Sequence, residues 1–401
     1  LQLGNAANIE NPDANDQHIV KLVDWVLQFA FEQGASDIHL EPRKDKGKIR
    51  FRIDGVLHTI YNMPANTLTA VISRIKILGR MNVAEKRKPQ DGRVKTKTPD
   101  GGEVELRLST LPTAFGEKMV MRIFDPDVLL KSPDQLGFSP DDLRRWASMT
   151  SQPNGIILVT GPTGSGKTVS LYTGLNILNT PDVNISTAED PVEINLEGIN
   201  QVNVNPKQGM DFTQALRAFL RQDPDIIMVG EIRDLDTASI AVKAAQTGHM
   251  VMSTLHTNSA AETLTRLRNM GVPSFNIATS VNLIIAQRLA RKLCNSCKKE
   301  VNVPRETLLA EGFPEDKIGT FKLYAPVGCD NCKNGYKGRV GIYEVVKNTP
   351  NLQRIIMEEG NSIEIAAQAK ADGFNDLRTS GLFKAMQGIT SLEEVNRVTK
   401  D

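Results

Sequence analysis

Long hydrophobic runs are missing from this chain of 401 residues. Its apolar stretches, such as 156–159 and 226–229, are far shorter than the ~20 residues that cross a bilayer, and no secretory signal pattern opens the sequence. We therefore expect any membrane association to be peripheral. An excess of one charge is missing too, because 48 Lys and Arg face 47 Asp and Glu, and this balance gives no overall field that would attract a polyanion.

The composition is that of a folded globular protein, with 40% hydrophobic, 24% charged and 5% aromatic residues. The length predicts two or three domains at roughly 100–200 residues each. The chain starts at Leu1 rather than at Met, so we expect that a natural N-terminal part precedes it.

The region 1–124 predicts a small α+β domain. Apolar residues recur at helical spacing from Asp16 to near Gly34 and again over 68–78. Alternating residues predict strands over 36–41, 48–53, 104–108 and 119–124. The proline-containing segment 125–140 predicts a linker, and 141–401 follows as the larger domain.

A phosphate-binding loop is predicted at the start of the larger domain. The run 156–159 precedes GPTGSGKT, and a helical pattern follows it, which is the GxxxxGK[ST] motif in its strand–loop–helix context. The alternative is a glycine-rich turn without a ligand. Lys167 is expected to reach the β- and γ-phosphates, and Thr168 to offer its hydroxyl to Mg²⁺. The predicted loop residues are Gly161, Pro162, Thr163, Gly164, Ser165, Gly166, Lys167 and Thr168.

The next predicted strand, 183–187, leads to Glu189, Asp190 and Glu193. The carboxyl ends of strands in an open parallel sheet face the ligand, so these acids are expected near the phosphates. A carboxylate there could orient water for attack on the γ-phosphorus, and the alternative is an acidic loop beside a proline.

A further strand, 226–229, ends in Gly230 and Glu231. P-loop proteins usually carry Asp at the end of such a strand, so Glu231 is the acid left to hold Mg²⁺ or its waters. Spacing does not decide whether Glu231 or Glu189 activates the water.

Two histidines flank the predicted strand 250–254. His249 precedes it and His256 follows it. A lone histidine is more often structural than chemical, and a phosphate-sensing role for His256 is the functional hypothesis.

The segment 220–234, LRQDPDIIMVGEIRD, is a long and specific string. It resembles the signature of the secretion ATPases that power type II secretion and type IV pili. The resemblance extends from SDIHLEP at 36–42 to the C-terminus and so covers nearly the whole chain. Within the family, GYKGRVGIYE at 335–344 and TSLEEVNRV at 390–398 are most similar to pilus-extension ATPases.

The resemblance implies residue roles that spacing leaves open. It implies an acidic box at Glu189, Asp190 and Glu193, with Glu189 as general base. It implies a Walker B segment in which Glu231 binds the metal and its waters. It also implies a histidine box from His249 to His256. It also implies a hexameric ring in which an N-terminal α+β (PAS-like) domain closes over the nucleotide and contributes arginines.

Arg107 and Arg122 match those arginines. Residue pattern alone favours pairing of Arg107 with Glu103 or Glu105, whereas the resemblance favours a phosphate contact, which suits the permanent charge and planar fork of arginine. The predicted catalytic residues are therefore Glu189, Glu231, Lys167, Arg107, Arg122 and His256. The predicted nucleotide-contacting set adds Asp190, Glu193, Arg217, Arg221, Arg233 and His249.

The four cysteines form two CxxC pairs, Cys294 with Cys297 and Cys329 with Cys332. Paired knuckles in a chain without a secretory signal favour zinc over disulfides, although the gap between the pairs exceeds that of common zinc ribbons. A closed four-sulfur site has no open position for water, so a structural zinc lobe over 291–339 is expected. Four unliganded thiols are the alternative, and acids in the insert argue against a nucleic-acid-binding ribbon.

We therefore predict an α/β protein with a RecA-like P-loop ATPase domain, a preceding α+β domain, a zinc lobe and C-terminal helices over 350–401. The expected function is an ATP-hydrolysing motor for type IV pilus assembly, with ATP, Mg²⁺ and Zn²⁺. The resemblance implies a cytoplasmic homo-hexamer at the inner membrane, acting on a platform protein and not on nucleic acid. The alternatives are a type II secretion or pilus-retraction ATPase and, in another class, a nucleic-acid translocase or helicase.

Overall fold

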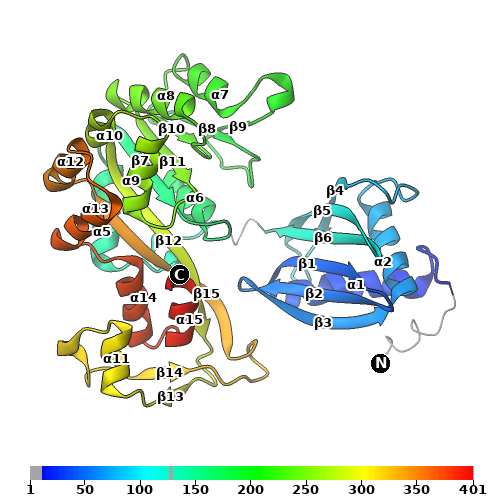
Figure 1. Ribbon diagram of the computed structural model, residues 1–401. Coiled ribbons are helices and arrows are strands. Elements are labelled where there is room, and N and C mark those ends of the chain that lie inside the picture. The colour runs from blue at the N-terminus through cyan, green and yellow to red at the C-terminus, as the bar shows by residue number, and fades with distance from the viewer. Residues whose placement is uncertain (1–10, 126–129, 401) are drawn as a thin grey trace. The chain divides into compact units, whose positions relative to one another are not determined.

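The computed structural model describes residues 11–125 and 130–400 and divides the chain into two compact units, Leu1–Val128 and Leu129–Asp401 (Figure 1). Residues 1–10 of the expected first domain and 126–129 of the expected linker lie outside the described residues. Of the expected linker, Asp125 belongs to the first unit and residues 130–140 belong to the second, where Leu136 is buried in the core.

The first unit is an antiparallel sheet with the strand order β3-β2-β1-β6-β5-β4 and two helices. Its elements are α1 (Gln17–Glu32), β1 (Ala35–Pro42), β2 (Lys46–Ile53), β3 (Val56–Pro64), α2 (Ala65–Leu78), β4 (Gln90–Lys97), β5 (Glu103–Thr113) and β6 (Gly116–Phe124).

One face of this sheet forms the core of the unit, because the strands alternate. Ile49, Phe51 and Ile53 of β2 are buried in one cluster with the apolar stripes of α1 and α2. The residues between them, such as Arg50 and Arg52, are more accessible to solvent. The predicted α+β fold is confirmed, and the sequence analysis predicted no strand at the positions of β3 and β4.

The second unit is built on a seven-stranded sheet with the order β15-β12-β7-β11-β10-β8-β9, in which only β15 runs antiparallel to its neighbour. Its strands are β7 (Gly155–Thr160), β8 (Ile185–Glu189), β9 (Asn200–Asn203), β10 (Ile226–Val229), β11 (Met250–Leu255), β12 (Val281–Leu293) and β15 (Tyr336–Lys347). Its helices are α4 (Pro133–Leu136), α5 (Pro140–Thr150), α6 (Lys167–Leu178), α7 (Phe212–Phe219), α8 (Leu235–Gln246), α9 (Ala260–Asn269) and α10 (Ser274–Ser280), followed by those of the lobe and C-terminus.

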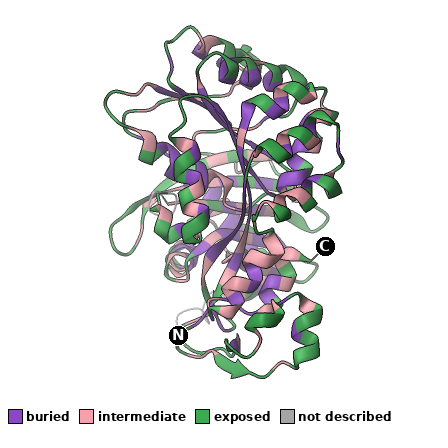
Figure 2. Ribbon diagram, turned by 90° about the vertical axis from the view of Figure 1, so that its left-hand side faces the viewer, coloured by how far each residue is buried: buried purple, intermediate pink, exposed green. Residues whose placement is uncertain are grey.

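Both faces of this sheet are covered, as a parallel sheet requires. Along β7, Ile156 and Leu158 belong to one hydrophobic cluster, and Ile157 and Val159 to the other. Figure 2 shows the buried strands running between helices whose outer surfaces are exposed. The predicted α/β fold of the larger domain is confirmed.

A small lobe lies between the two long strands β12 and β15. β12 ends at Leu293, directly before the first cysteine, and β15 begins at Tyr336, shortly after the last. Between them lie β13 (Lys299–Val301), α11 (Arg305–Glu311) and β14 (Leu323–Ala325).

The predicted helical C-terminus is confirmed. It follows β15, which continues to Lys347 and pairs with β12 along its length. The helices that follow are α12 (Pro350–Met357), α13 (Ser362–Ala371), α14 (Leu377–Met386) and α15 (Leu392–Thr399). Within the described ranges, no helix has the length and apolar character needed to span a bilayer.

Candidate functional site

The carboxyl ends of four neighbouring strands meet at one edge of the second unit's sheet. Parallel pairing places Thr160 beside Leu255, and Val229 beside both Ser253 and Ala188. The residues that follow these strand ends therefore gather at that edge. They surround a cavity of 430 Å³ whose lining includes Thr163, Gly164, Ser165, Gly166, Lys167, Thr168, Glu189, Asp190, Glu193, Glu231, Arg233 and His256.

The phosphate-binding loop has the backbone that its glycines permit. Gly164 and Gly166 adopt φ angles of 80° and 85°, which disfavour residues with a Cβ atom. At Gly161 a Cβ atom would lie 2.4 Å from the Ser165 hydroxyl and 2.7 Å from the Gln287 carbonyl oxygen. The loop then opens α6, whose N-terminal N–H groups and dipole suit a phosphate.

Lys167, His256 and Glu231 form a chain of contacts across this cavity. The Lys167 ammonium lies 2.9 Å from Nδ1 of His256, and Nε2 of His256 lies 3.1 Å from Oε1 of Glu231. An ammonium can only donate, so this geometry fits the histidine tautomer with its hydrogen on Nε2, donated to the carboxylate. The other Glu231 oxygen accepts from Arg233 Nε at 2.7 Å. The sequence could not reveal this chain, because its members come from three separate segments.

The Lys167 side chain also bonds the loop itself, donating to the Gly161 carbonyl at 2.5 Å. Burial lowers the pKa of Lys167 to about 8, and the Glu231 carboxylate partly opposes this shift. The ammonium is therefore less stable here than in water and is well placed to gain from an anion.

Glu189, at the end of β8, is buried and fully engaged in hydrogen bonds. Its Oε1 accepts from the Tyr172 hydroxyl, and its Oε2 accepts from Thr187 Oγ1 at 2.7 Å and from Gln201 Nε2 at 3.0 Å. Burial and the hydrogen bond to Glu189 raise the pKa of Tyr172, which therefore stays protonated as a donor. Tyr172 and Gln201 were missed by sequence reasoning, which considered the phosphate-loop motif and otherwise only charged residues and histidines.

Sequence reasoning also missed a glutamine that supports the phosphate-binding loop. Gln287, buried on β12, donates to the Ser165 carbonyl at 2.7 Å and accepts from the Ser170 hydroxyl at 2.7 Å. It holds the phosphate-binding loop from behind. It lies 120 residues after Lys167, so no local pattern could link the two.

Among the predicted residues of the second unit, Gly161, Pro162, His249, Arg217 and Arg221 do not line the cavity. His249 precedes β11, at the opposite edge of the sheet from His256, and its Nδ1 lies 3.0 Å from the Ala244 carbonyl oxygen. Arg217, in the last turn of α7, and Arg221, just beyond it, are exposed.

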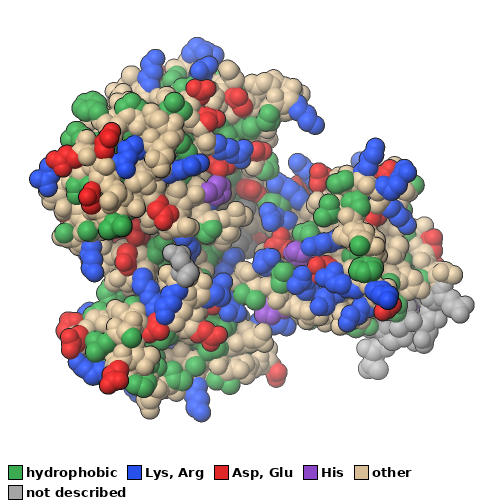
Figure 3. All heavy atoms as spheres, in the orientation of Figure 1, with side chains coloured by type: hydrophobic (Ala, Val, Ile, Leu, Met, Phe, Trp, Pro, Cys, Tyr) green, Lys and Arg blue, Asp and Glu red, His purple; other side chains and the backbone are tan. Residues whose placement is uncertain are grey.

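Arg107 and Arg122 lie directly opposite each other on β5 and β6 of the first unit. Arg107 contacts Glu105 at 3.2 Å and stacks over the Phe124 ring, while Arg122 contacts Asp37 at 3.0 Å. Arg93 of β4 stands opposite Arg107 in the same row. Figure 3 shows Lys and Arg side chains gathered on the visible face of this unit. Adjacent like charges disfavour a sheet, and the contacts with Glu105 and Asp37 offset part of this repulsion.

A buried carboxylate anchors the segment after His256. Glu344 of β15 accepts from the Ala260 N–H at 2.8 Å, where α9 begins. Burial raises the pKa of Glu344 to about 7, with Asp376 adding to the shift and the N–H groups of Ala260 and Leu377 opposing it.

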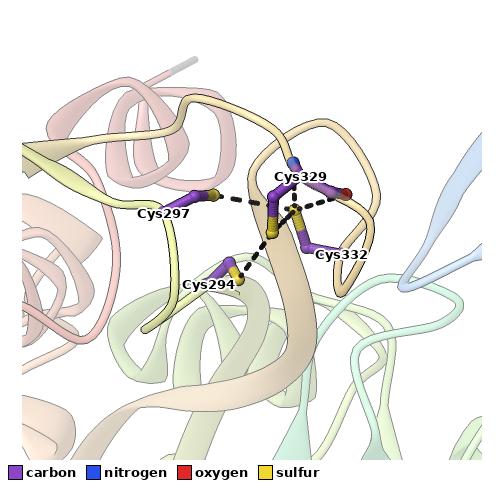
Figure 4. A group of neighbouring side chains, drawn as sticks. All are labelled: Cys294, Cys297, Cys329 and Cys332. Carbon is purple, nitrogen blue, oxygen red and sulfur yellow. Dashed lines mark hydrogen bonds between the residues drawn. The ribbon is translucent and has the colours of Figure 1, made fainter.

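The four cysteines of the lobe converge, as Figure 4 shows. All four sulfur atoms lie within 4.8 Å of one another, with pairs separated by 3.8, 3.7 and 3.6 Å. Sulfurs at ~2.3 Å from a tetrahedral centre are about 3.8 Å apart, so the donor set fits a four-sulfur metal site. The N–H of Gly328 also donates to Cys297 Sγ at 3.3 Å.

Comparison with known proteins places these features in one family. Residues 12–397 match the family described as type II/IV secretion system protein. The chain is 68% identical to the type IV pilus assembly ATPase PilB of Pseudomonas aeruginosa, over 100% of this chain and 72% of that protein. It is 46% identical to the type II secretion system protein E of Xanthomonas campestris, over 97% of this chain and 68% of that one. Among solved structures, the pilus retraction motor PilT with bound ADP matches with a TM-score of 0.63 and 25% identity, covering 94% of this chain and 96% of PilT.

Proposed function

The chain belongs to the type II/IV secretion system protein family and is an ATPase, and we propose that its hydrolysis of ATP powers type IV pilus assembly. The observation that carries the proposal is the difference in similarity. Identity reaches 68% with a pilus assembly ATPase and 46% with a type II secretion protein, over nearly the same length of this chain.

The cavity residues take the following roles in this proposal. The loop N–H groups and Lys167 bind the phosphates, and Glu189 accepts a proton from the attacking water. Thr168 and Glu231 hold Mg²⁺, which when bound neutralises phosphate charge. His256, which bridges Lys167 and Glu231, relays the presence of the γ-phosphate to Glu231.

Arg107 and Arg122 act on the γ-phosphate when the two units close. The row of Arg93, Arg107 and Arg122 supports this, because guanidinium groups suit the charge and geometry of phosphate oxygens. Arg217, Arg221 and Arg233 serve the interfaces between subunits or sense phosphate, and His249 belongs to the same histidine box. The working form is a cytoplasmic homo-hexamer at the inner membrane, acting on a platform protein.

The cysteine lobe holds a structural Zn²⁺ through Cys294, Cys297, Cys329 and Cys332. The sulfur separations support zinc, which accepts four thiolates in a closed tetrahedral site. Zinc there supplies folding energy and takes no part in hydrolysis.

Turnover and genetics test the function together. Lys167→Ala should abolish ATP hydrolysis, and a deletion strain that expresses this variant should have no surface pilin. The control is Lys243→Ala, which alters a lysine of α8 outside the cavity and should behave as the parent. Normal pilin assembly with lost secretion, or loss of retraction only, would assign the motor to the alternative systems. Strong stimulation of turnover by nucleic acid would instead favour a translocase.

A further inference from the structure

Three hydrogen-bond donors from three different elements converge on the Glu189 carboxylate. Tyr172 comes from α6, which begins at Lys167, and Gln201 comes from β9, next to β8 in the sheet. Thr187 lies two residues before Glu189 on β8 itself. Both carboxylate oxygens are held, so neither the position nor the rotation of the carboxylate is free.

Two of these donors also hold the loop that follows Glu189. The Tyr172 hydroxyl accepts from the Glu193 N–H at 3.1 Å. The Gln201 amide donates to the Ile194 carbonyl at 3.0 Å and accepts from the Leu196 N–H at 2.7 Å. Thr187 makes no such contact. A substitution of Thr187 therefore affects the hydrogen bonding of the carboxylate but not that of the loop.

The placement of Tyr172 is unusual for a residue that only fills the core. Its ring is fully buried among apolar residues, yet its hydroxyl faces an ionisable group that lines the nucleotide cavity. Burial disfavours a charged carboxylate, and a donated hydrogen bond favours it. A hydroxyl here therefore fixes the direction of the Glu189 carboxylate that lines the cavity.

We propose that Tyr172 is a positioning residue for Glu189, in which one hydroxyl from the phosphate-loop helix fixes the carboxylate and the loop behind it. This rests on the proposed role of Glu189 as the base. No proton leaves Tyr172, which remains a donor throughout, and the water's proton goes to Glu189. Because Tyr172 is five residues after Lys167 on one helix, the base and the phosphate site are held in fixed register.

The test is the pH profile of kcat in Tyr172→Phe. Loss of a hydrogen bond to a charged group should lower kcat about tenfold and move its acid limb up by roughly one pH unit, with the KM for ATP within twofold of the parent. Thr187→Val should move the acid limb in the same direction. Tyr343→Phe is the matched control, because the Tyr343 hydroxyl is also buried but donates to the Leu136 carbonyl, so its pH profile should be that of the parent.

The outcomes separate this inference from the proposed function. An acid limb that stays at the parent's pH in both Tyr172→Phe and Thr187→Val overturns the positioning role, even if both variants melt earlier. Glu189→Gln with turnover like that of the parent overturns the base assignment itself, and with it the proposal. Failure of Tyr172→Phe to fold would leave Thr187→Val to decide.

Discussion

Glu344→Gln should remove a loss of folding stability that the parent protein undergoes as the pH rises. Glu344 has a pKa of about 7 in the folded protein against an ordinary value of 4.5. Between these values the folded chain holds a proton that the unfolded chain has released, so stability falls as pH rises. The full difference corresponds to about 3 kcal/mol at ~1.36 kcal/mol per pH unit. Glutamine carries no titrating proton and still offers an oxygen to the Ala260 N–H.

Thermal melts of parent and variant at several pH values between 5 and 8 measure this effect. The melting temperature of Glu344→Gln relative to the parent should rise with pH, by on the order of 5–10 °C across the range. The control is Glu394→Gln, because Arg397 and Arg291 hold the pKa of the buried Glu394 at about 2 against its desolvation. Its stabilising contribution is complete above pH 5 and is lost only as pH falls toward 2, so its variant should melt earlier by a constant amount. A Glu344→Gln difference that stays constant with pH would refute the reasoning.

Three further predictions concern the nucleotide site, the lobe and the first unit. ATP affinity should fall by up to about tenfold between pH 8 and 9, because Lys167 loses its charge above a pKa of about 8, and calorimetry with a non-hydrolysable analogue showing constant affinity would contradict this. Cys294→Ser should lose zinc and destabilise the lobe while ATP binding persists, since zinc contributes on the order of 10–16 kcal/mol to the site it folds, and elemental analysis finding no zinc in the parent would disprove it. Arg107→Ala and Arg122→Ala should lower kcat far more than ATP affinity, with Lys a poor substitute, whereas normal kcat in both would leave the arginines with only their contacts to Glu105 and Asp37.

Three of the parallel strands that build the site could be predicted because they are short and mainly apolar. β7, β10 and β11 are buried along their whole length. The chain leads from these strands, in the same order, to Gly161, Glu231 and His256. β4 could not be predicted, because QDGRVKTK carries a single apolar residue, Val94, and the strand forms only by pairing with β5.

The predicted site residues follow strand ends, whereas the groups that hold them do not. Tyr172, Gln201 and Gln287 act through contacts between distant segments, which no spacing rule describes. The two histidines of the predicted box show the converse limit. His249 and His256 are seven residues apart, and the extended strand between them places them at opposite edges of the sheet.

The long paired strands β12 and β15 connect the phosphate-binding loop with the cysteine lobe. Gln287 holds β12 at the loop, and the sulfur cluster begins one residue beyond Leu293, roughly 20 Å farther along β12. Any rotation of β12 at the phosphate loop would therefore produce a larger displacement at the lobe, where a spectroscopic label would detect it.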